Sequence, residues 1–264
     1  MLNEENSYPL STINLKTVLS KSTIKCIQSL ADKKARAEAN CFIAEGPKIV
    51  EALIGLNGIC VQHIYALPKW VDQHKNLLEK RKIKVDVITE IELEKISQLQ
   101  TPNQVVAMVQ QFKRLDTTIF HDGLYIMLDG IQDPGNMGTI IRTADWFGVA
   151  GIFCSEDCVD IYNSKVVQSS MASIANVQIG YGNLVHILKQ KKDIAVYGAV
   201  LNGDDMRNVS LQKNGIIIIG NESKGIRDDL LPFVKQAITI PKFGKAESLN
   251  AAVAAGIILN WFRR

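Results

Sequence analysis

The chain has 264 residues, of which 47% are hydrophobic and 22% are charged, and its formal net charge is +3. This composition is typical of a globular protein of one or two domains, each large enough to bury a core. The N-terminus lacks the apolar segment of a signal peptide, and we find no apolar run of about 18 residues, so neither secretion nor membrane insertion is expected.

The five cysteines form no C-x-x-C pair, and no histidine lies at a metal-ligand spacing from them. We therefore expect reduced thiols, a cytoplasmic protein and no bound metal.

Basic residues are concentrated in the N-terminal part of the chain. Residues 1–114 contain 16 Lys and Arg against 12 Asp and Glu, whereas residues 115–264 contain 14 against 15. The basic excess indicates a polyanionic partner for the first part, and a solvated surface of mixed charge is the alternative.

The first part of the chain predicts a small α/β unit. A helical pattern begins near Thr23, "CFIAEG" predicts a short strand that ends at Gly46, and a helix follows over 47–56 with proline in its first turn. Further strands are predicted at "VQHIYAL", "IKVDVIT" and "QVVAMVQQF", with a helix over 71–82. The polar segment 113–123 interrupts this pattern, so we predict one domain over 1–114 and a second over 115–264.

The second part alternates predicted strands and helices. The strands are expected at 124–128, 152–154, 194–200, 216–219 and 237–240, and the helices at 136–147, 164–173, 184–192 and 248–262. Runs such as "GIIIIG" are apolar on both faces, which is typical of parallel strands covered by helices on each side. The pattern predicts an open, doubly wound sheet, whose ligands bind beyond the carboxyl ends of the strands. Segments 129–142, 220–225 and 241–250 lie there.

The common nucleotide-binding and hydrolase motifs are missing from the sequence. We find no G-x-G-x-x-G after a strand, no G-x-x-x-x-G-K-[ST], no H-E-x-x-H and no G-x-S-x-G. A nicotinamide-dependent enzyme fits the α/β pattern but lacks this glycine fingerprint.

In segment 129–142, Asn136, Thr139 and Arg142 follow one another at three-residue intervals on one flank of a predicted helix. Asn136 is well placed as the N-cap. The structural alternative is that Asn136 is only a cap and that Arg142 pairs with Asp145.

The other two segments also combine glycine with polar residues. Gly220 would let the backbone approach a ligand, and Glu222 would place an acid beside the sheet. Ser248 and Asn250 are possible caps of the last helix. Turn formation and close helix packing explain each segment singly, but all three segments fall at the same edge of one sheet.

Together, "DPGNMGTIIRTADWFG", "IIGNESKGI" and "IPKFGKAESLNAAVAAG" resemble, in order, the three motifs of the SpoU (TrmH) family of RNA ribose 2′-O-methyltransferases, in the SPOUT superfamily. The segment "SLADKKARAEANCFIAEGPKIVEAL" is similar to the family's N-terminal substrate-binding domain. One departure concerns substrate contacts, because many relatives carry arginine at the position of Gln168 and glycine at that of Ala172.

The resemblance implies a C-terminal parallel sheet with a trefoil knot, which general topology rules treat as an exception, preceded by a small α/β ribosomal-protein-like domain. It also implies a homodimer whose interface contributes to the active site, and S-adenosylmethionine as a cofactor held mainly by backbone groups. By motif position, the cofactor residues are Leu201, Gly220, Asn221, Ile240 and Leu249. The implied catalytic residues are Asn136, Arg142, Glu222, Ser248 and Asn250.

The family's favoured proposal makes the arginine at the position of Arg142 the general base. A guanidinium pKa exceeds ~12, so the alternative is a charged Arg142 that clamps the adjacent phosphate and lowers the pKa of the hydroxyl. Asn136 would orient the ribose or the arginine, and Glu222 would hold one of these two side chains. Ser248 and Asn250 would complete the pocket.

RNA is the expected partner, because the 2′-hydroxyl distinguishes RNA from DNA. Lys33, Lys34 and Arg36 would contact phosphates from a helix of the N-terminal domain, with a solvated helix face as the alternative. This domain resembles the ribosomal-RNA branch of the family more than the transfer-RNA branch.

The remaining alternatives are a transfer-RNA ribose methyltransferase, a relative that methylates a base nitrogen, and a non-catalytic RNA-binding or ribosome-assembly protein that retains the fold. Retention of the five implied catalytic residues argues against the last of these.

Overall fold

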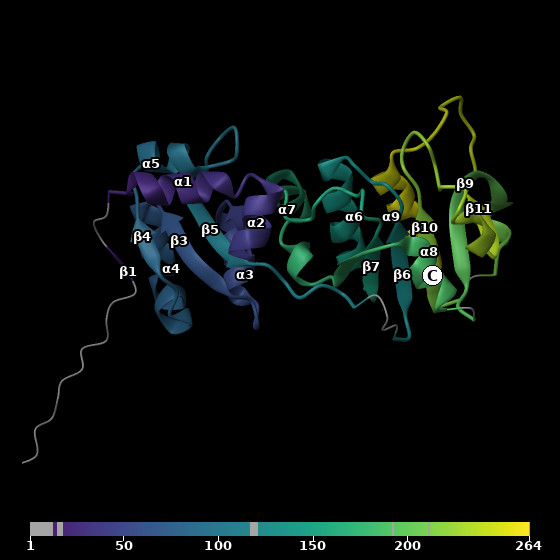
Figure 1. Cartoon of the computed structure of the whole chain (residues 1–264), viewed down its shortest axis with the longest axis horizontal. Coiled ribbons are helices and arrows are strands. Elements are labelled where there is room, and N and C mark those ends of the chain that lie inside the picture. Colours follow the sequence, from purple (N-terminus) through teal and green to yellow (C-terminus); the bar gives the residue numbers. More distant parts are fainter. Residues whose placement is uncertain (1–12, 15–17, 117–120, 192, 211, 264) are drawn as a thin grey trace, which may run out of the picture. The chain divides into compact units, whose positions relative to one another are not determined.

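The structure, a computed structural model, describes residues 13–14, 18–116, 121–191, 193–210 and 212–263. The chain divides into two compact units, Met1–Gln111 and Phe112–Arg264 (Figure 1). Among the described residues, no helix is long and apolar enough to cross a membrane, and no group of three or more His, Cys, Asp or Glu could hold a metal ion.

The N-terminal unit is a five-stranded mixed sheet in the order β1-β4-β3-β5-β2, in which β5 runs antiparallel to both of its neighbours. Its elements in chain order are β1 (Ile13–Asn14), α1 (Lys21–Ser29), α2 (Lys33–Ala39), β2 (Cys41–Glu45), α3 (Pro47–Gly55), β3 (Val61–Ala66), α4 (Pro68–Arg81), β4 (Val85–Val87), α5 (Glu90–Ile96) and β5 (Val105–Gln110).

Local signals explain where these helices begin. Asp32 accepts hydrogen bonds from the first turn of α2 and so separates this helix from α1. Proline occupies the first turn of both α3 and α4, where its missing N–H costs no helical hydrogen bond. The short helix α5, which the sequence did not predict, starts with a capping box between Thr89 and Glu92.

The C-terminal unit is a six-stranded sheet in the order β11-β9-β10-β6-β7-β8, and its neighbouring strands pair in parallel. Its helices and strands in chain order are β6 (Leu124–Leu128), α6 (Pro134–Trp146), β7 (Gly151–Cys154), α7 (Ser164–Ser170), β8 (Ile179–Tyr181), α8 (Leu184–Lys189), β9 (Val196–Asp205), β10 (Gly215–Ile219), β11 (Gln236–Thr239) and α9 (Ala251–Phe262), with short 3-10 turns η1 (Ser173–Ala175), η2 (Met206–Asn208) and η3 (Leu231–Phe233).

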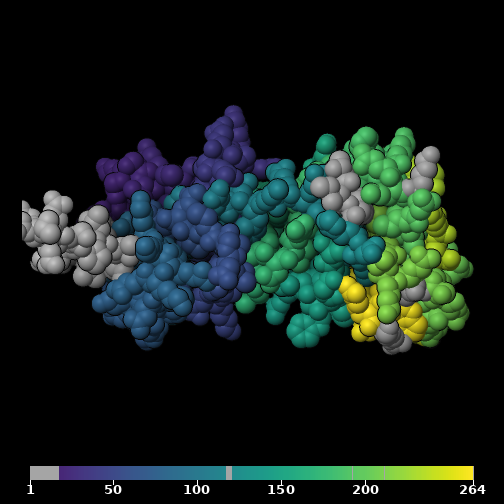
Figure 2. Space-filling view, turned by 90° about the horizontal axis from the view of Figure 1, so that it is seen from below, coloured from purple at the N-terminus to yellow at the C-terminus, as the bar shows by residue number. Residues whose placement is uncertain are grey.

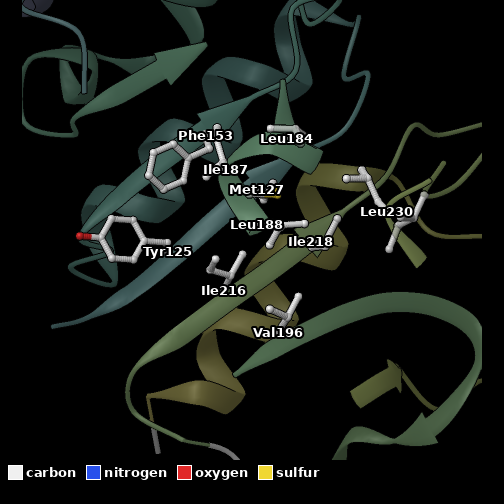
Figure 3. Packing of buried hydrophobic residues seen from close by; sticks show 11 residues of the cluster. Tyr125, Met127, Phe153, Leu184, Ile187, Leu188, Val196, Ile216, Ile218 and Leu230 are labelled. Atoms are coloured by element: carbon white, nitrogen blue, oxygen red, sulfur yellow. The ribbon is translucent and has the colours of Figure 1, made fainter. Parts of the chain in front are cut away.

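The parallel α/β prediction for this unit is confirmed. Every residue of β6, β7 and β10 is buried, as expected for strands covered on both faces. On one face, Leu184, Ile187 and Leu188 of α8 pack against alternate residues of the strands, including Met127 and Ile218 (Figure 3). Strand order alone does not establish how the chain is threaded, so the trefoil knot stays a prediction.

The helices α6 and α9 pack against each other. The last residues of the chain, drawn in yellow, lie at the surface beside earlier residues of the same unit (Figure 2). A Cβ on Gly256 of α9 would lie 3.8 Å from the Thr143 side chain of α6, so the two helices approach closely at this point.

Two predicted helix starts need correction. Helix α6 begins at Pro134, with Asp133 as its N-cap, so Asn136 is not the cap and its side chain is left for other contacts. Helix α9 begins at Ala251 with Asn250 as its N-cap, and Ser248 lies in the preceding loop. Proline at the first helical position accounts for the earlier start of α6.

Candidate functional site

A cavity of about 590 Å³ opens at the carboxyl ends of β10 and β11, beside residues 199–202 in the middle of β9. It forms where β9 separates from β10. Strand β9 pairs with β10 as far as Ala199, and its register with β11 shifts so that Ala237 faces Gly198 but Ile238 faces Asp204. The volume is within the usual range for a pocket that binds a small molecule. The residues expected to bind the cofactor all line this cavity, namely Leu201, Gly220, Asn221, Ile240 and Leu249.

A tight hairpin after β10 forms one wall of the cavity. Asn221 and Gly225 exchange backbone hydrogen bonds of 3.0 and 2.9 Å, and the side-chain oxygen of Asn221 accepts from two further backbone N–H groups in the turn. A Cβ on Gly220 would overlap the backbone of Gly225 and Ile226. Glycine is therefore required at position 220 by the fold of the hairpin itself.

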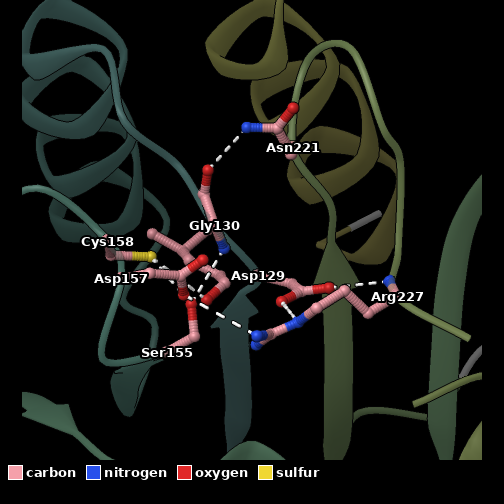
Figure 4. A network of polar contacts seen from close by, with 8 residues as sticks. Asp129, Gly130, Ser155, Asp157, Cys158, Asn221 and Arg227 are labelled. Carbon is pink, nitrogen blue, oxygen red and sulfur yellow. Dashed lines mark hydrogen bonds and ion pairs between the residues drawn. The ribbon is translucent and has the colours of Figure 1, made fainter. Parts of the chain in front are cut away.

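The same hairpin is fastened to the loop after β6 (Figure 4). The amide Nδ2 of Asn221 donates to the carbonyl of Gly130 at 2.7 Å. Arg227 donates to the buried carboxylate of Asp129 through its backbone N at 2.8 Å, and its Nε lies 2.6 Å from that carboxylate. A buried carboxylate needs such partners. The Asp129–Arg227 pair therefore ties the loop after β6 to the end of the hairpin.

Sequence reasoning missed Asp129 and Arg227 as supports of the site. The available signal was an aspartate that directly follows a fully buried strand, at the edge where ligands bind. Its partner lies 98 residues later, and nothing in the local sequence identifies it.

A chain of three side chains joins the three motif segments. Asn136 Nδ2 donates to Glu222 Oε1 at 2.6 Å, and Asn250 Nδ2 donates to Asn136 Oδ1 at 2.8 Å. Asn250 Oδ1 accepts from the backbone N–H groups of Ala252 and Val253. The carboxylate at one end and the helix N–H groups at the other therefore determine which way both amides point.

Arg142 is not part of this hydrogen-bonded set of three side chains. Its side chain is exposed on α6, six residues after Asn136, which corresponds to roughly 9 Å along the helix. The alternative pairing with Asp145 does not form, and Asp145 instead accepts a hydrogen bond from Asn176 at 2.9 Å. Within the described part of the chain, the Arg142 guanidinium has no hydrogen bond or ion pair. The guanidinium is therefore available to bind a group of another molecule.

Ser248, the remaining implied catalytic residue, is exposed and lines the cavity together with Glu222. Asn136 and Asn250 lie beside the cavity through their contacts with Glu222 and α9, without lining it. The structure thus brings four of the five residues to one place and leaves Arg142 on the neighbouring helix surface.

The thiol of Cys158 lies in the polar network next to this site (Figure 4). A hydrogen bond from Cys154 lowers the pKa of Cys158 to about 7, although burial opposes the shift. Asp157 is in the same loop, and a hydrogen bond from Ser155 holds the pKa of its carboxyl below the ordinary value. Both shifts favour negative charge near Gly130 and Arg227.

The prediction that Arg36 faces RNA is wrong. Only 3% of its surface is exposed, and its Nη1 donates to the carbonyls of Leu30 and Ala31 at 2.9 and 2.7 Å. The guanidinium satisfies backbone groups after α1, so it supports the fold of the unit. Lys33 and Lys34 are exposed, and the Lys34 ammonium lies 3.9 Å from the Glu38 carboxylate in a surface pair.

The two departures from the family pattern differ in kind. Ala172 has a φ of 71°, a conformation that glycine adopts more easily than alanine, so a glycine there suits the backbone rather than a substrate. Gln168 is a half-buried residue of α7, and its carbonyl accepts from the N–H of Met171.

Both units of the chain are similar to known proteins. Residues 123–260 match the model of the SpoU rRNA Methylase family, and residues 21–107 match the MRM3-like substrate binding domain. The 23S rRNA (guanosine(2553)-2′-O)-methyltransferase RlmP of Bacillus subtilis is 30% identical over 243 residues, which cover 91% of this chain and 95% of that protein.

Solved structures agree over nearly the full length. A putative RNA methyltransferase of the TrmH family from Porphyromonas gingivalis is 31% identical with a TM-score of 0.83, covering 94% of this chain and 99% of the other. An AdoMet-bound rRNA methyltransferase from Sinorhizobium meliloti is 29% identical with a TM-score of 0.85, covering 96% and 98%. The chain therefore belongs to the SpoU rRNA methylase family.

Proposed function

We propose that this chain transfers a methyl group from S-adenosylmethionine to a ribose 2′-hydroxyl of ribosomal RNA. The observation that carries the proposal is the hydrogen-bonded chain from Glu222 through Asn136 to Asn250 beside a cavity of about 590 Å³. Family membership supports the reaction, and the relative from Bacillus subtilis is named as a 23S rRNA 2′-O-methyltransferase.

The cavity suits S-adenosylmethionine in size and in chemistry. Its inner wall is apolar, with Ile219, Ile240 and Ile258, and its turns present the backbone of the Gly220 hairpin. The exposed carboxylate of Glu222 at its edge complements a sulfonium cation. When bound, this cofactor supplies an activated methyl group.

The protein's own part in the reaction is to place the ribose and to stabilise the oxygen as it becomes anionic. We assign the placement to the Asn136 amide, whose orientation is set by Glu222 and Asn250. We assign a charged role to Arg142, because a guanidinium holds its proton and binds a phosphate with two parallel hydrogen bonds. Such a charge lowers the pKa of a nearby hydroxyl.

A homodimer would complete the site. Trp146 of α6 is 85% exposed, and Val253 and Ile257 of α9 are 51% and 37% exposed on the adjacent helix. Apolar side chains on two packed helices form a surface suited to a second copy of the chain. Arg142 is one turn before Trp146 on α6, so this dimer would bring it toward the partner's site.

The N-terminal unit is proposed as the RNA-binding domain, over 1–114, and residues 115–264 as the catalytic domain. Lys33 and Lys34 are exposed at the start of α2, where they are able to contact phosphates. The five cysteines are all free, which agrees with a reaction in the cytoplasm.

Methyl transfer to ribosomal RNA tests the proposal. Ribosomal RNA from cells that lack the gene is incubated with the protein and radiolabelled S-adenosylmethionine, and the labelled site is mapped by resistance of its linkage to alkali. A single resistant linkage is the expected result. Label on a base with a cleavable linkage, label only on transfer RNA, or cofactor binding with no transfer would each overturn it.

Arg142→Ala supplies the matched variant. Loss of a charge-stabilising group is expected to lower kcat by about 10²–10³-fold while leaving cofactor affinity unchanged. Arg142→Lys keeps the charge but loses the bidentate hydrogen bond to the phosphate, and we expect a kcat between those of the wild type and Arg142→Ala. Wild-type turnover in Arg142→Ala would remove this residue from the mechanism.

A further inference from the structure

Phe243 places an aromatic ring at the open mouth of the cavity. It lies in the loop between β11 and α9, lines the cavity, and yet has 88% of its surface exposed. Single exposed hydrophobic residues are common on protein surfaces. Phe243 differs from these because a second group braces its ring.

That group is Arg207, in the 3-10 turn η2 that follows β9. Its guanidinium carbon lies 5.8 Å from the centroid of the Phe243 ring. Asp205 fixes the guanidinium plane, since Nη2 donates to Oδ2 at 2.6 Å and Nε donates to Oδ1 at 3.0 Å. An exposed ion pair contributes little stability. The arrangement is better explained by what it presents to the solvent.

We propose that Phe243, braced by Arg207 and Asp205, is a stacking platform for a nucleobase of the RNA at or next to the methylated ribose. The inference rests on the proposed function and adds a substrate-contacting residue to it. Bases in unpaired RNA are commonly bound by stacking on aromatic rings and on guanidinium planes, and both are present here. Every base has a flat face, so this platform is expected to tolerate different bases.

The exposure of Phe243 distinguishes this role from a cover over the cofactor. Small-molecule pockets bury most of their ligand. Buried or half-buried residues such as Ile219 and Ile240 supply the inner cavity wall. Leu201 and Leu249 are 69% and 46% exposed, and Phe243 is the most exposed of these side chains. A ring that is almost wholly exposed fits a ligand that arrives from outside the cavity.

The charge of the loop distinguishes this role from a contact with a second copy of the chain. Lys242 and Lys245 flank Phe243 and are exposed, as phosphate-binding side chains must be. The apolar surface that suits a dimer lies elsewhere, on α6 and α9. An aromatic ring between lysines therefore matches an RNA strand better than a protein surface.

Three substitutions of Phe243 test the platform in the full-length protein. The probe is radiolabelled ribosomal RNA from cells that lack the gene, with its Kd measured by filter binding and the Kd of S-adenosylmethionine measured by calorimetry. Phe243→Ala and Phe243→Leu are expected to weaken RNA binding about tenfold, the loss of one stacked base. Phe243→Tyr keeps the ring and is expected to bind within about twofold of the wild type.

Several outcomes would overturn the platform. Wild-type RNA affinity in Phe243→Leu would mean that apolar bulk suffices, and an equal loss of cofactor affinity would mean that the ring covers the cofactor. A change of oligomeric state in Phe243→Ala would assign the ring to an interface. Because RNA binding is measured without turnover, a wild type that binds RNA but transfers no methyl group would defeat only the proposed function.

Arg207→Lys tests the brace. This change keeps the charge but removes the planar group, so RNA affinity is expected to fall about threefold in the wild-type background and not at all in the Phe243→Ala background. Effects that add in full in the double variant would show that Arg207 acts by itself, and the bracing role would be wrong.

Discussion

Asn136 and Glu222 are 86 residues apart in the chain and are joined by a hydrogen bond of 2.6 Å between their side chains. The amide donates to the carboxylate, so its oxygen is turned toward Asn250, which donates to it in turn. One asparagine thus connects the helix after β6, the hairpin after β10 and the start of α9. Its orientation depends on both neighbours.

Asn136→Asp tests this dependence. An aspartate has no N–H to donate, and its charge would face that of Glu222, so we expect lower Tm and at least a tenfold drop in kcat. The double variant Asn136→Asp with Glu222→Gln restores a donor facing an acceptor, and its Tm is expected to return toward that of the wild type. Scanning calorimetry and methyl transfer measure the two effects. A double variant no more stable than Asn136→Asp alone would contradict the pairing.

Gly220→Ala is expected to weaken S-adenosylmethionine binding by about tenfold or more, because the added Cβ overlaps the backbone of the hairpin that lines the cavity. Gly244→Ala is the matched control, since Gly244 also lines the cavity and a Cβ there meets nothing within 4 Å. Calorimetric titration with the cofactor gives both affinities. Equal losses in the two variants would mean that loop flexibility, rather than the overlap, controls binding.

The elements of the C-terminal unit were largely predictable because their signal is local. Strand β10 is Gly215 followed by four isoleucines, and the predicted span 216–219 differs from Gly215–Ile219 by one residue. The sequence does not predict the three-residue strand β8, because glycine, which is depleted in strands, occupies its centre. The sequence predicts a start of α6 that is two residues late, because Asn136 and Asp133 are both good N-cap residues and only Asp133 is the cap.

The sequence predicts where the site lies in the fold but not most of its side-chain contacts. The topology of a parallel sheet brings the three motif segments to one edge. The family resemblance adds that Glu222 holds Asn136 or Arg142, and the structure shows the contact with Asn136. Within the described residues, Arg142 has no hydrogen bond or ion pair with either side chain. Likewise, the sequence predicts that Arg36 belongs to a basic surface cluster. Nothing in its local sequence shows that its guanidinium donates hydrogen bonds to the backbone carbonyls after α1. Contacts between distant segments and the burial of single side chains required the structure.

Lys33→Ala with Lys34→Ala is expected to weaken binding of ribosomal RNA and to reduce the slope of log Kd against log salt by about 1–2, as phosphate contacts are lost. Tm should remain near that of the wild type, because both lysines are exposed. Arg36→Ala should instead lower the Tm, since it leaves two backbone carbonyls without their donor. A normal Tm in Arg36→Ala, or an unaltered salt slope in the lysine variant, would contradict this division of roles.

Glu45 makes the stability of the N-terminal unit depend on pH. Burial raises the pKa of its carboxyl above 4.5, against hydrogen bonds from Ser97 and from the N–H of Gln98 that lower it. A raised pKa in the folded state means that the stabilising contribution is complete below the ordinary pKa and is lost as pH rises through the raised value. Glu45→Gln stays neutral and still offers Gln98 an acceptor.

We therefore expect the Tm of the wild type, measured relative to Glu45→Gln, to fall as pH rises from about 4 to 7. Calorimetric unfolding of both proteins across this range gives the difference between their Tm values. The effects of other titrating groups on Tm are common to both proteins and cancel in this difference. A difference that is constant or that rises with pH would show that the hydrogen bonds to Glu45 outweigh its burial.

Val253→Glu with Ile257→Glu tests the proposed dimer surface on α9. Two carboxylates in an apolar contact are costly to bury, so the variant is expected to sediment as a monomer. Its kcat should fall steeply, because Arg142 would no longer reach a partner's site, while cofactor affinity should change little. The control is Leu231→Glu in η3, a side chain of similar exposure in the same unit. A variant that stays dimeric would place the interface elsewhere, and a monomer with full activity would mean that each chain carries a complete site.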